Sequence, residues 1–428
     1  MIECSGRNML LSTSLYRDVR SSVLDWMKSV QMTDGTIYNW RMNEGADATI
    51  FTSCFALFIL DLFGEVEKLP ARHIREWAEH ILSFQDEESG YFIDPSARTR
   101  ARSETKGFRH LTQQLTCFCL SALGILGSSP RYPLTFLSEW PDDRSVKDYL
   151  GRIGCADGVR SSGNNAMFLG IFLSYQVERF RDESARQRLE AWFQWHNEHQ
   201  NPNTGFWGTA RRLIYYGGFQ NALHQFLVFN YWNRPISYAP RIIDRILAVQ
   251  DTDGFFAPWP GGASCYEYDA LDTLVHLSTR NLYRRQEVID ALAKALESLV
   301  RTQNADGGFC QSLMRPKNAP ELLQSLYRRR SADPYLYCYR AKATLRSMRP
   351  KVSTIRTGWT QIGRTWTDSN LWDTWFRCLA IAEVQTALSE ADLPWRFHDV
   401  IGLGWFPSRR HRGKEVSNSF ADHPKVST

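Results

Sequence analysis

Three carboxylates within six residues form the densest cluster of side chains with catalytic potential in this sequence. Glu267, Asp269 and Asp272 follow a glycine pair and stand where an apolar helix is expected to begin. Crowded carboxylates raise one another's pKa values, and apolar surroundings raise them further. A carboxylic acid that stays protonated at neutral pH can act as a general acid. The alternative interpretation is that these residues only cap the helix, since acidic residues are favoured in first turns.

Polar side chains recur at the starts of the other apolar segments. Those we expect to bind substrate are Asp47, Gln113, Asn164, Asn165 and Asp373. His224 lies between apolar residues, so it is either a neutral core imidazole or a general acid or base. Each polar residue alone could cap a helix or be a satisfied core group, but together they predict a polar mouth above an apolar well.

Aromatic residues make up 13% of the chain, and most of them are expected to fill the core. Four that stand at turns or helix starts are candidates for lining the cavity: Trp259, Tyr266, Tyr268 and Trp372. Aromatic faces stabilise cations and also stack on sugar rings, so these residues do not choose between an isoprenoid and a glycan substrate.

An internal repeat defines the elements that must position these side chains. Six turns contain a glycine, at positions 35, 90, 158, 205, 254 and 307, with spacings of 55, 68, 47, 49 and 53 residues. A period of this size is typical of a repeat architecture in which no unit buries its apolar face alone. A glycine at this point suits a helix end, because it adopts the left-handed conformation without strain.

The segments on the two sides of each turn differ in pattern. Those before the turns are amphipathic, as residues 241–247 show, whereas several after the turns are apolar on nearly all sides: 51–60, 115–126, 166–173 and 223–229. A helix that is apolar all round is expected to be buried. The sequence therefore predicts an all-α, (α/α)6 toroid, with six inner helices inside six outer ones. We place the sixth inner helix at 370–387.

This pattern predicts one toroid domain over residues 21–406. Residues 1–20 form an N-terminal segment, and 407–428 form a polar C-terminal tail. Residues at about 315–364 fit the repeat poorly and contain four prolines, so we expect an insertion there, before the last inner helix.

A helix that ends in Gln303, followed by Asp306-Gly-Gly-Phe309 and an apolar helix, resembles the toroid superfamily of terpenoid cyclases and protein prenyltransferase β subunits. The resemblance covers about residues 21–387. It implies a central cavity that holds the active site. Generic (α/α)6 glycan-active enzymes share this architecture, and a fold alone does not assign a reaction.

Two catalytic templates of that superfamily match only in part. Class II terpene cyclases carry Asp-x-Asp-Asp-Thr, in which the middle Asp protonates an alkene. Asp269, Asp272 and Thr273 match its outer positions, but Leu271 replaces the acid. The shifted register, which begins at Glu267, makes Asp269 the middle acid and loses the third carboxylate.

Protein prenyltransferases bind zinc with an Asp-x-Cys-Tyr segment and a later His. Here Cys265 and Cys338 lie in similar segments, but Ala263 replaces the Asp and Leu336 replaces the His. Because one thiolate does not hold a zinc ion, we expect no metal site and no stoichiometric zinc. Mg²⁺ would be compatible with a diphosphate substrate.

The remaining composition indicates a globular protein with scattered charge. The net charge is +5, and no nucleic-acid motif or transmembrane-length apolar stretch is present in the sequence. Nine cysteines without zinc-finger spacing favour a reducing cytoplasmic location.

For function, the resemblance implies a terpenoid cyclase-like enzyme of the lyase or isomerase type, which acts on an apolar isoprenoid small molecule. Asp269 would donate the proton, and Glu267 and Asp272 would tune its pKa. One alternative is a glycan-active lyase, hydrolase or epimerase that uses the same carboxylates with His224. A second alternative is a non-catalytic toroid that serves as a scaffold.

Overall fold

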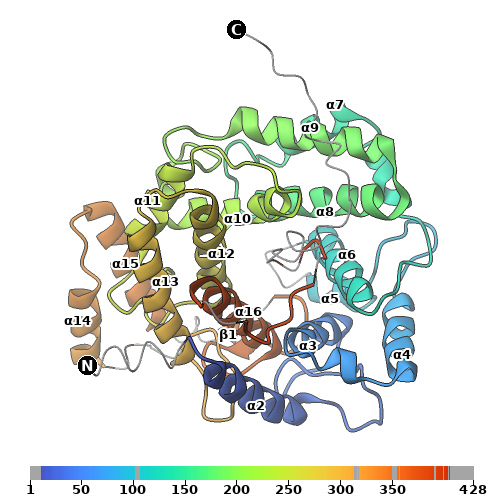
Figure 1. The fold of residues 1–428 in the computed structure, drawn as a ribbon, viewed down its shortest axis with the longest axis horizontal. Coiled ribbons are helices and arrows are strands. Elements are labelled where there is room, and N and C mark those ends of the chain that lie inside the picture. The colour runs from blue at the N-terminus through green and yellow to red at the C-terminus, as the bar shows by residue number, and fades with distance from the viewer. Residues whose placement is uncertain are drawn as a thin grey trace.

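A computed structural model of the chain describes residues 11–101, 107–312, 316, 318–348, 354–355, 357–389, 392–398, 400–402 and 404. The fold is all-α, as predicted, and its helices form two concentric rings (Figure 1). The inner helices are α3 (Ile50–Leu62), α6 (Phe108–Ile125), α8 (Ser162–Phe180), α10 (Tyr216–Tyr231), α12 (Ser264–Arg280) and α16 (Leu371–Leu388). The outer helices are α2 (Thr13–Val30), α4 (Ala71–Leu82), α7 (Asp143–Arg152), α9 (Glu183–His199), α11 (Ala239–Val249) and α13 (Arg285–Val300).

The inner ring is closed. Each inner helix contacts the next one along the chain, and α16 returns to contact both α12 and α3 (Figure 1). The sixth inner helix begins at Leu371, where the sequence predicted it. This closure brings residues of α16 beside residues of α12 that are about a hundred positions earlier in the chain.

Burial explains why the two rings differ in sequence. Every residue of α3 except Leu60 is buried, because neighbouring inner helices and the outer ring cover all of its sides. In α4, by contrast, only Trp77, Ala78, Ile81 and Leu82 are buried. These positions form one stripe along the helix, so an amphipathic sequence satisfies an outer helix and an apolar one satisfies an inner helix.

The repeated Gln-and-Gly turns connect each repeat to the next. The Gln200 side chain donates hydrogen bonds to the carbonyl of Gly205, at 2.7 Å, and to the carbonyl of Ser237 in the following repeat, at 3.0 Å. Gln85 and Gln250 make equivalent pairs of bonds. Gly205 has φ +76°, and a Cβ there would lie 2.3 Å from the side chain of Ile242. The Gln therefore fastens the turn, and the glycine permits its backbone to pass close to the next outer helix.

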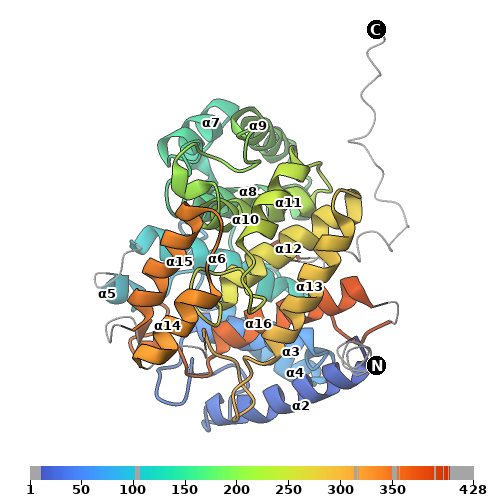
Figure 2. The same ribbon diagram turned by 90° about the vertical axis from the view of Figure 1, so that its left-hand side faces the viewer.

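The predicted insertion contains a helical hairpin and a short β pair. Helices α14 (Ala319–Arg328) and α15 (Pro334–Ser347) lie side by side outside the ring (Figure 2). Strands β1 (Thr354–Ile355) and β2 (Arg364–Thr365) pair antiparallel before α16. A buried ion pair between Arg329 and Asp251 attaches the hairpin to the fifth turn of the repeat.

Four short helices lie in the connections between the rings: η1 (Val66–Lys68), α5 (Ala97–Ala101), η2 (Thr135–Glu139) and η3 (Arg211–Leu213). Helix α2 begins at Thr13, so part of the segment predicted to precede the ring belongs to the first outer helix. The predicted tail, 407–428, lies outside the described residues. Within the described part of the chain, no helix is both long and apolar enough to cross a membrane.

Candidate active site

The inward face of the ring can be recognised from partial exposure on otherwise covered helices. On α10, the residues that keep some exposure are Gly217, Gln220, Asn221 and His224. Their spacing of i, i+3, i+4 and i+7 places them on one face of the helix. Because α8, α11 and α12 cover other sides of α10, we assign this face to the ring interior.

The same criterion places three residues of α12 on the interior face. Cys265 and Tyr266 are half-buried, whereas the other residues of the first two turns of α12 are buried. Asp269 lies one turn below Cys265 and keeps 6% exposure. The helix start that the sequence singled out therefore presents Asp269 to the interior.

Asp269 is the carboxyl group best suited to hold a transferable proton. No side-chain hydrogen bond to Asp269 is present among the described residues, although its carboxyl group is almost fully enclosed. Burial raises the pKa of Asp269 well above its usual range, and the charges of Asp272 and Glu267 raise it further. The protonated form of the group is therefore favoured, and no side chain among the described residues occupies its oxygens.

Glu267 is occupied by the backbone of its own repeat. Its carboxylate accepts N–H groups of Phe256 at 2.6 Å, Ala257 at 2.9 Å and Ala263 at 3.3 Å. Burial raises the pKa of Glu267 to about 7, against the opposing effects of Arg377 and the first two of these hydrogen bonds. Glu267 therefore anchors the turn before α12 and affects Asp269 through its charge.

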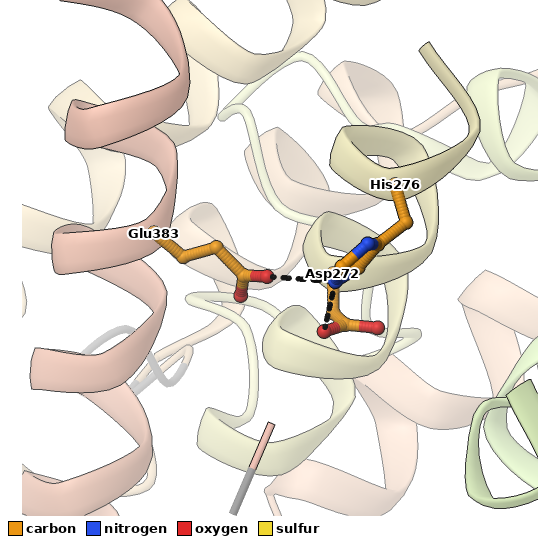
Figure 3. A group of neighbouring side chains, drawn as sticks. All are labelled: Asp272, His276 and Glu383. Carbon is orange, nitrogen blue, oxygen red and sulfur yellow. Dashed lines mark ion pairs between the residues drawn. The ribbon is translucent and has the colours of Figure 1, made fainter. Parts of the chain in front are cut away.

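Asp272 lies deeper in the ring than Asp269. Its Oδ1 accepts a hydrogen bond from the hydroxyl of Tyr268 at 3.1 Å and lies 3.5 Å from Nε2 of His276. The hydroxyl of Tyr268 therefore points along α12 toward Asp272 and away from the mouth. Glu383 of α16 completes this group, with Oε1 at 3.8 Å from the same imidazole nitrogen (Figure 3).

Aromatic side chains cover the opposite side of the interior. Five of them, named here the aromatic wall, pack against one another in edge-to-face, tilted and stacked geometries: Phe55, Phe118, Trp359, Trp372 and Trp375. They come from α3, α6, α16 and the loop that precedes β2. The predicted cavity residue Trp372 therefore belongs to this wall.

The loop at 357–363 lies over the mouth beside the aromatic wall. The indole N–H of Trp359 donates to Oε1 of Gln114 at 2.9 Å, and Arg100 donates to the carbonyl of Gly358 at 2.7 Å. The carboxylate of Asp47 accepts the backbone N–H of Gln361 at 2.8 Å. Asp47, which the sequence predicted to bind substrate, thus binds a segment of its own chain.

The other predicted binding residues divide into two groups. Asn165 lies on the α8 side, and its Oδ1 is 2.9 Å from Nδ1 of His110, while Asn164 is half-buried beside it. Gln113 is buried and lies close to the hydroxyls of Tyr91 and Tyr149.

Asp373 belongs to a buried network at the start of α16. Its carboxylate accepts from Asn370 at 2.6 Å and from Arg364 at 3.2 Å, and it also binds the hydroxyl of Ser264. Because Ser264 begins α12, this network joins the starts of the last two inner helices. All of its polar partners belong to the protein.

Trp259 and Tyr266 meet at the mouth near α12. Their rings pack edge-to-face at 4.9 Å, and Trp366 packs on Trp259 at 5.5 Å. A hollow of about 660 Å³ on the outer surface, lined by residues of α2 and of the turn after α13, contains none of the predicted site residues. This hollow therefore does not coincide with the predicted site.

The chain closes the opposite end of the ring. Ser121 of α6 donates a hydrogen bond to the carbonyl of Ile401 at 3.1 Å, and Gly402 lies against Ile171 of α8. At Gly404, with φ +80°, a Cβ would lie 1.7 Å from the hydroxyl of Tyr268. A segment near the end of the described chain thus reaches the interior below Asp269.

Comparison with known proteins identifies the fold family. Residues 4–105 and 146–317 match the family model described as prenyltransferase alpha-alpha toroid domain, and these stretches cover more than half of the chain. The chain belongs to this toroid family. No curated protein matches the chain.

The family match ends at residue 317, close to the start of the predicted insertion. Helix α16 therefore lies outside the matched stretches, although it closes the toroid and supplies Trp372, Asp373 and Glu383. Helix α6 also lies outside the matched stretches, so the family pattern covers four of the six inner helices.

The zinc site of protein prenyltransferases does not fit this toroid. Cys265 is half-buried at the start of α12, and Cys338 is exposed on α15. Among the described residues, neither thiol belongs to a group of three potential metal ligands. Ala263 and Leu336 supply no donor atoms in place of the missing Asp and His, as the sequence indicated.

Four residues of this toroid interior were not identified from the sequence: His276, Trp359, Arg377 and Glu383. Arg377 is completely buried on α16, where Nη2 donates to the carbonyl of Gln311 at 2.8 Å. Its Nε and Nη1 have no hydrogen-bond partner among the described residues. Its charge opposes the rise in the pKa of Glu267. Arg377 and Glu383 could have been identified from the sequence, because charged residues within an otherwise apolar helix are rare unless they are paired.

Proposed function

We propose that the protein is a toroid enzyme that protonates an apolar, isoprenoid-type substrate, with Asp269 as the general acid. The observation that carries this proposal is the state of Asp269 itself. It is an enclosed carboxyl group on the interior face of α12, with a raised pKa and no side-chain hydrogen bond among the described residues. An acid that stays protonated at neutral pH can deliver a proton to a weakly basic carbon.

The aromatic wall supports this choice of substrate. Protonation of an alkene produces a carbocation, and the negative faces of aromatic rings stabilise cations. Phe118 and Trp372 each keep 9% exposure, so the wall is not completely sealed from the interior. An enclosed apolar site also keeps water away from a cation that water would otherwise quench.

The other carboxylates take supporting roles in this proposal. Asp272 and Glu267 raise the pKa of Asp269 through their charges, whereas the oxygens of Glu267 and Oδ1 of Asp272 accept hydrogen bonds from the protein. Tyr266, Trp259 and His224 remain candidates for contact with substrate, because each keeps some exposure near the mouth or on the interior face.

Turnover in D₂O tests the proposed reaction. The full-length protein is incubated with linear isoprenoids, both hydrocarbons and diphosphates, and the products are analysed by mass spectrometry. A protonation-initiated reaction predicts an isomeric product that carries one solvent deuterium. Asp269→Asn should reduce the rate by roughly 10²–10⁴-fold, the usual contribution of a general acid. An unchanged rate in this variant would remove Asp269 from the mechanism.

A second candidate substrate class is a glycan, because the α8 and α10 side of the interior is polar. Asn164, Asn165, Gln220, Asn221 and His224 all keep some exposure there. Such a surface suits hydroxyl groups better than a hydrocarbon. Under this alternative, Asp269 would protonate a glycosidic oxygen. Uronic-acid and neutral oligosaccharides, assayed beside the isoprenoids, separate the two proposals by which class is consumed.

A further inference from the structure

A buried group of three ionisable side chains lies deeper in the ring than the proposed general acid. It consists of Asp272 and His276, one turn apart on α12, and Glu383 on α16, and we call it the buried triad (Figure 3). One ligand atom from each residue lies within 4.8 Å of the other two. Both carboxylate side chains are fully buried, and that of His276 keeps 11% exposure.

The polar atoms of the buried triad are poorly satisfied by the protein. Both oxygens of Glu383 and Oδ2 of Asp272 have no hydrogen-bond partner among the described residues. No arginine or lysine within that part of the chain forms an ion pair with either carboxylate, and His276 is their shared neighbour. Leaving buried carboxylate oxygens without partners is costly, so the arrangement calls for either a shared proton or a bound cation.

We propose that the buried triad binds one divalent transition-metal ion, with Zn²⁺ as the representative, through Asp272, His276 and Glu383. Carboxylate oxygens and an imidazole nitrogen are ligands that zinc accepts. Ligands held about 2.0–2.1 Å from a tetrahedral Zn²⁺ lie about 3.4 Å from one another. The observed separations from Nε2 of His276 are 3.5 Å to Asp272 and 3.8 Å to Glu383, so only a small contraction is needed.

The position of the triad suggests what the ion does. The hydroxyl of Tyr268 donates to Oδ1 of Asp272, which holds this carboxylate from outside the triad. Because α12 and α16 are the last two inner helices and contact each other, an ion bound between them would cross-link this part of the inner ring. This site differs from the zinc site of protein prenyltransferases in both residues and position, and it does not use Asp269 as a ligand. It departs from the expectation, drawn from the sequence, of no metal site.

Metal content and affinity test the proposal on the full-length chain. Protein stripped with a chelator and dialysed against Zn²⁺ should retain about one ion per chain by elemental analysis. Glu383→Gln and His276→Ala should each weaken Zn²⁺ binding at least tenfold in calorimetric titration. The matched control is Asp61→Asn, because the buried Asp61 pairs with the half-buried His398 at 2.8 Å. Among the described residues this pair belongs to no group of three potential metal ligands. This control should bind zinc as the wild type does.

Thermal unfolding distinguishes a metal site from a structural defect. With chelator, Glu383→Gln should melt at or above the wild-type temperature, since it removes a buried carboxylate. With Zn²⁺, only proteins with the intact triad should gain thermal stability.

Three outcomes would overturn the proposal. They are retention of no zinc, equal retention by wild type and Glu383→Gln, and retention that is lost only when Cys265 or Cys338 is replaced. The first outcome would indicate that the two carboxylates share a proton instead.

Discussion

The indole N–H of Trp359 donates a 2.9 Å hydrogen bond to Oε1 of Gln114, which joins the loop before β2 to the inner helix α6. Both side chains are buried, and the Trp359 ring also packs on Trp372 at 4.3 Å. A loop from the insertion thereby becomes part of the wall of the interior. The contact links the mouth of the ring to the aromatic residues below it.

Trp359→Phe should loosen this loop without unfolding the ring. The change keeps an aromatic ring but leaves Gln114 with a buried, unpaired oxygen, which costs about 1–3 kcal/mol. We expect the loop at 357–363 to be cleaved roughly 5- to 100-fold faster in limited proteolysis. Trp192→Phe is the control, since it removes a 2.9 Å bond to the carbonyl of Ala166 away from the mouth. Equal cleavage of that loop in both variants would contradict a specific role for Trp359.

Replacing Asp251 should be among the most destabilising single changes in the outer part of the fold. Arg329 binds its carboxylate, and Nε of Arg340 lies 4.0 Å from the same oxygen, with all three side chains buried. Asp251→Asn would leave two buried cations without their counter-charge, a loss of about 3–5 kcal/mol. Chemical denaturation measures this loss. The exposed pair Lys28 and Asp25 provides the comparison, because Lys28→Ala should cost less than about 1 kcal/mol.

The pH dependence of stability should report on Glu267. Its pKa is raised from 4.5 to about 7 in the folded protein. A raised pKa stabilises the fold fully below pH 4.5, and this contribution is lost as the pH rises to about 7. At about 1.4 kcal/mol per pKa unit, the loss amounts to roughly 3 kcal/mol.

Glu267→Gln should therefore flatten the fall in stability between pH 4.5 and 7, although it also weakens the hydrogen bonds to the turn. Denaturant titrations across this range provide the measurement. Glu76→Gln, on the exposed face of α4, should leave the wild-type pH dependence unchanged. A profile for Glu267→Gln that parallels the wild type would show that another group titrates in this window.

The ring could be predicted from the sequence because its information is local and repeated. Each turn carries a Gly, five of the six also carry a Gln, and the inner helices differ from the outer ones in periodicity over a few turns. Even the sixth inner helix was correctly placed at its beginning. The start of α2 was less clear, since the apolar stripe extends before residue 21 without a strong N-terminal cap.

The interior could be predicted only in part, because it depends on contacts across the ring. Sequence spacing identified the carboxylates of α12 but did not show that backbone N–H groups occupy Glu267. It also did not show that Glu383 meets Asp272 and His276, since Glu383 lies on the closing helix. The i, i+4 spacing of Asp272 and His276 is present in the sequence and is compatible with metal binding. The third residue of the buried triad, Glu383, could be identified only from the folded structure.

The protonation state of Asp269 is the central claim of this account, and infrared difference spectroscopy measures it directly. The spectrum of wild type minus Asp269→Asn is recorded across a pH series, with Glu267→Gln as a second reference. We predict that Asp269 contributes the carbonyl band of a protonated carboxyl group at pH 7 in wild type, and that this contribution is lost in Asp269→Asn and retained in Glu267→Gln. It should disappear only when the pH rises through the elevated pKa of Asp269. A carboxylate band for Asp269 at pH 7 would contradict its role as a general acid.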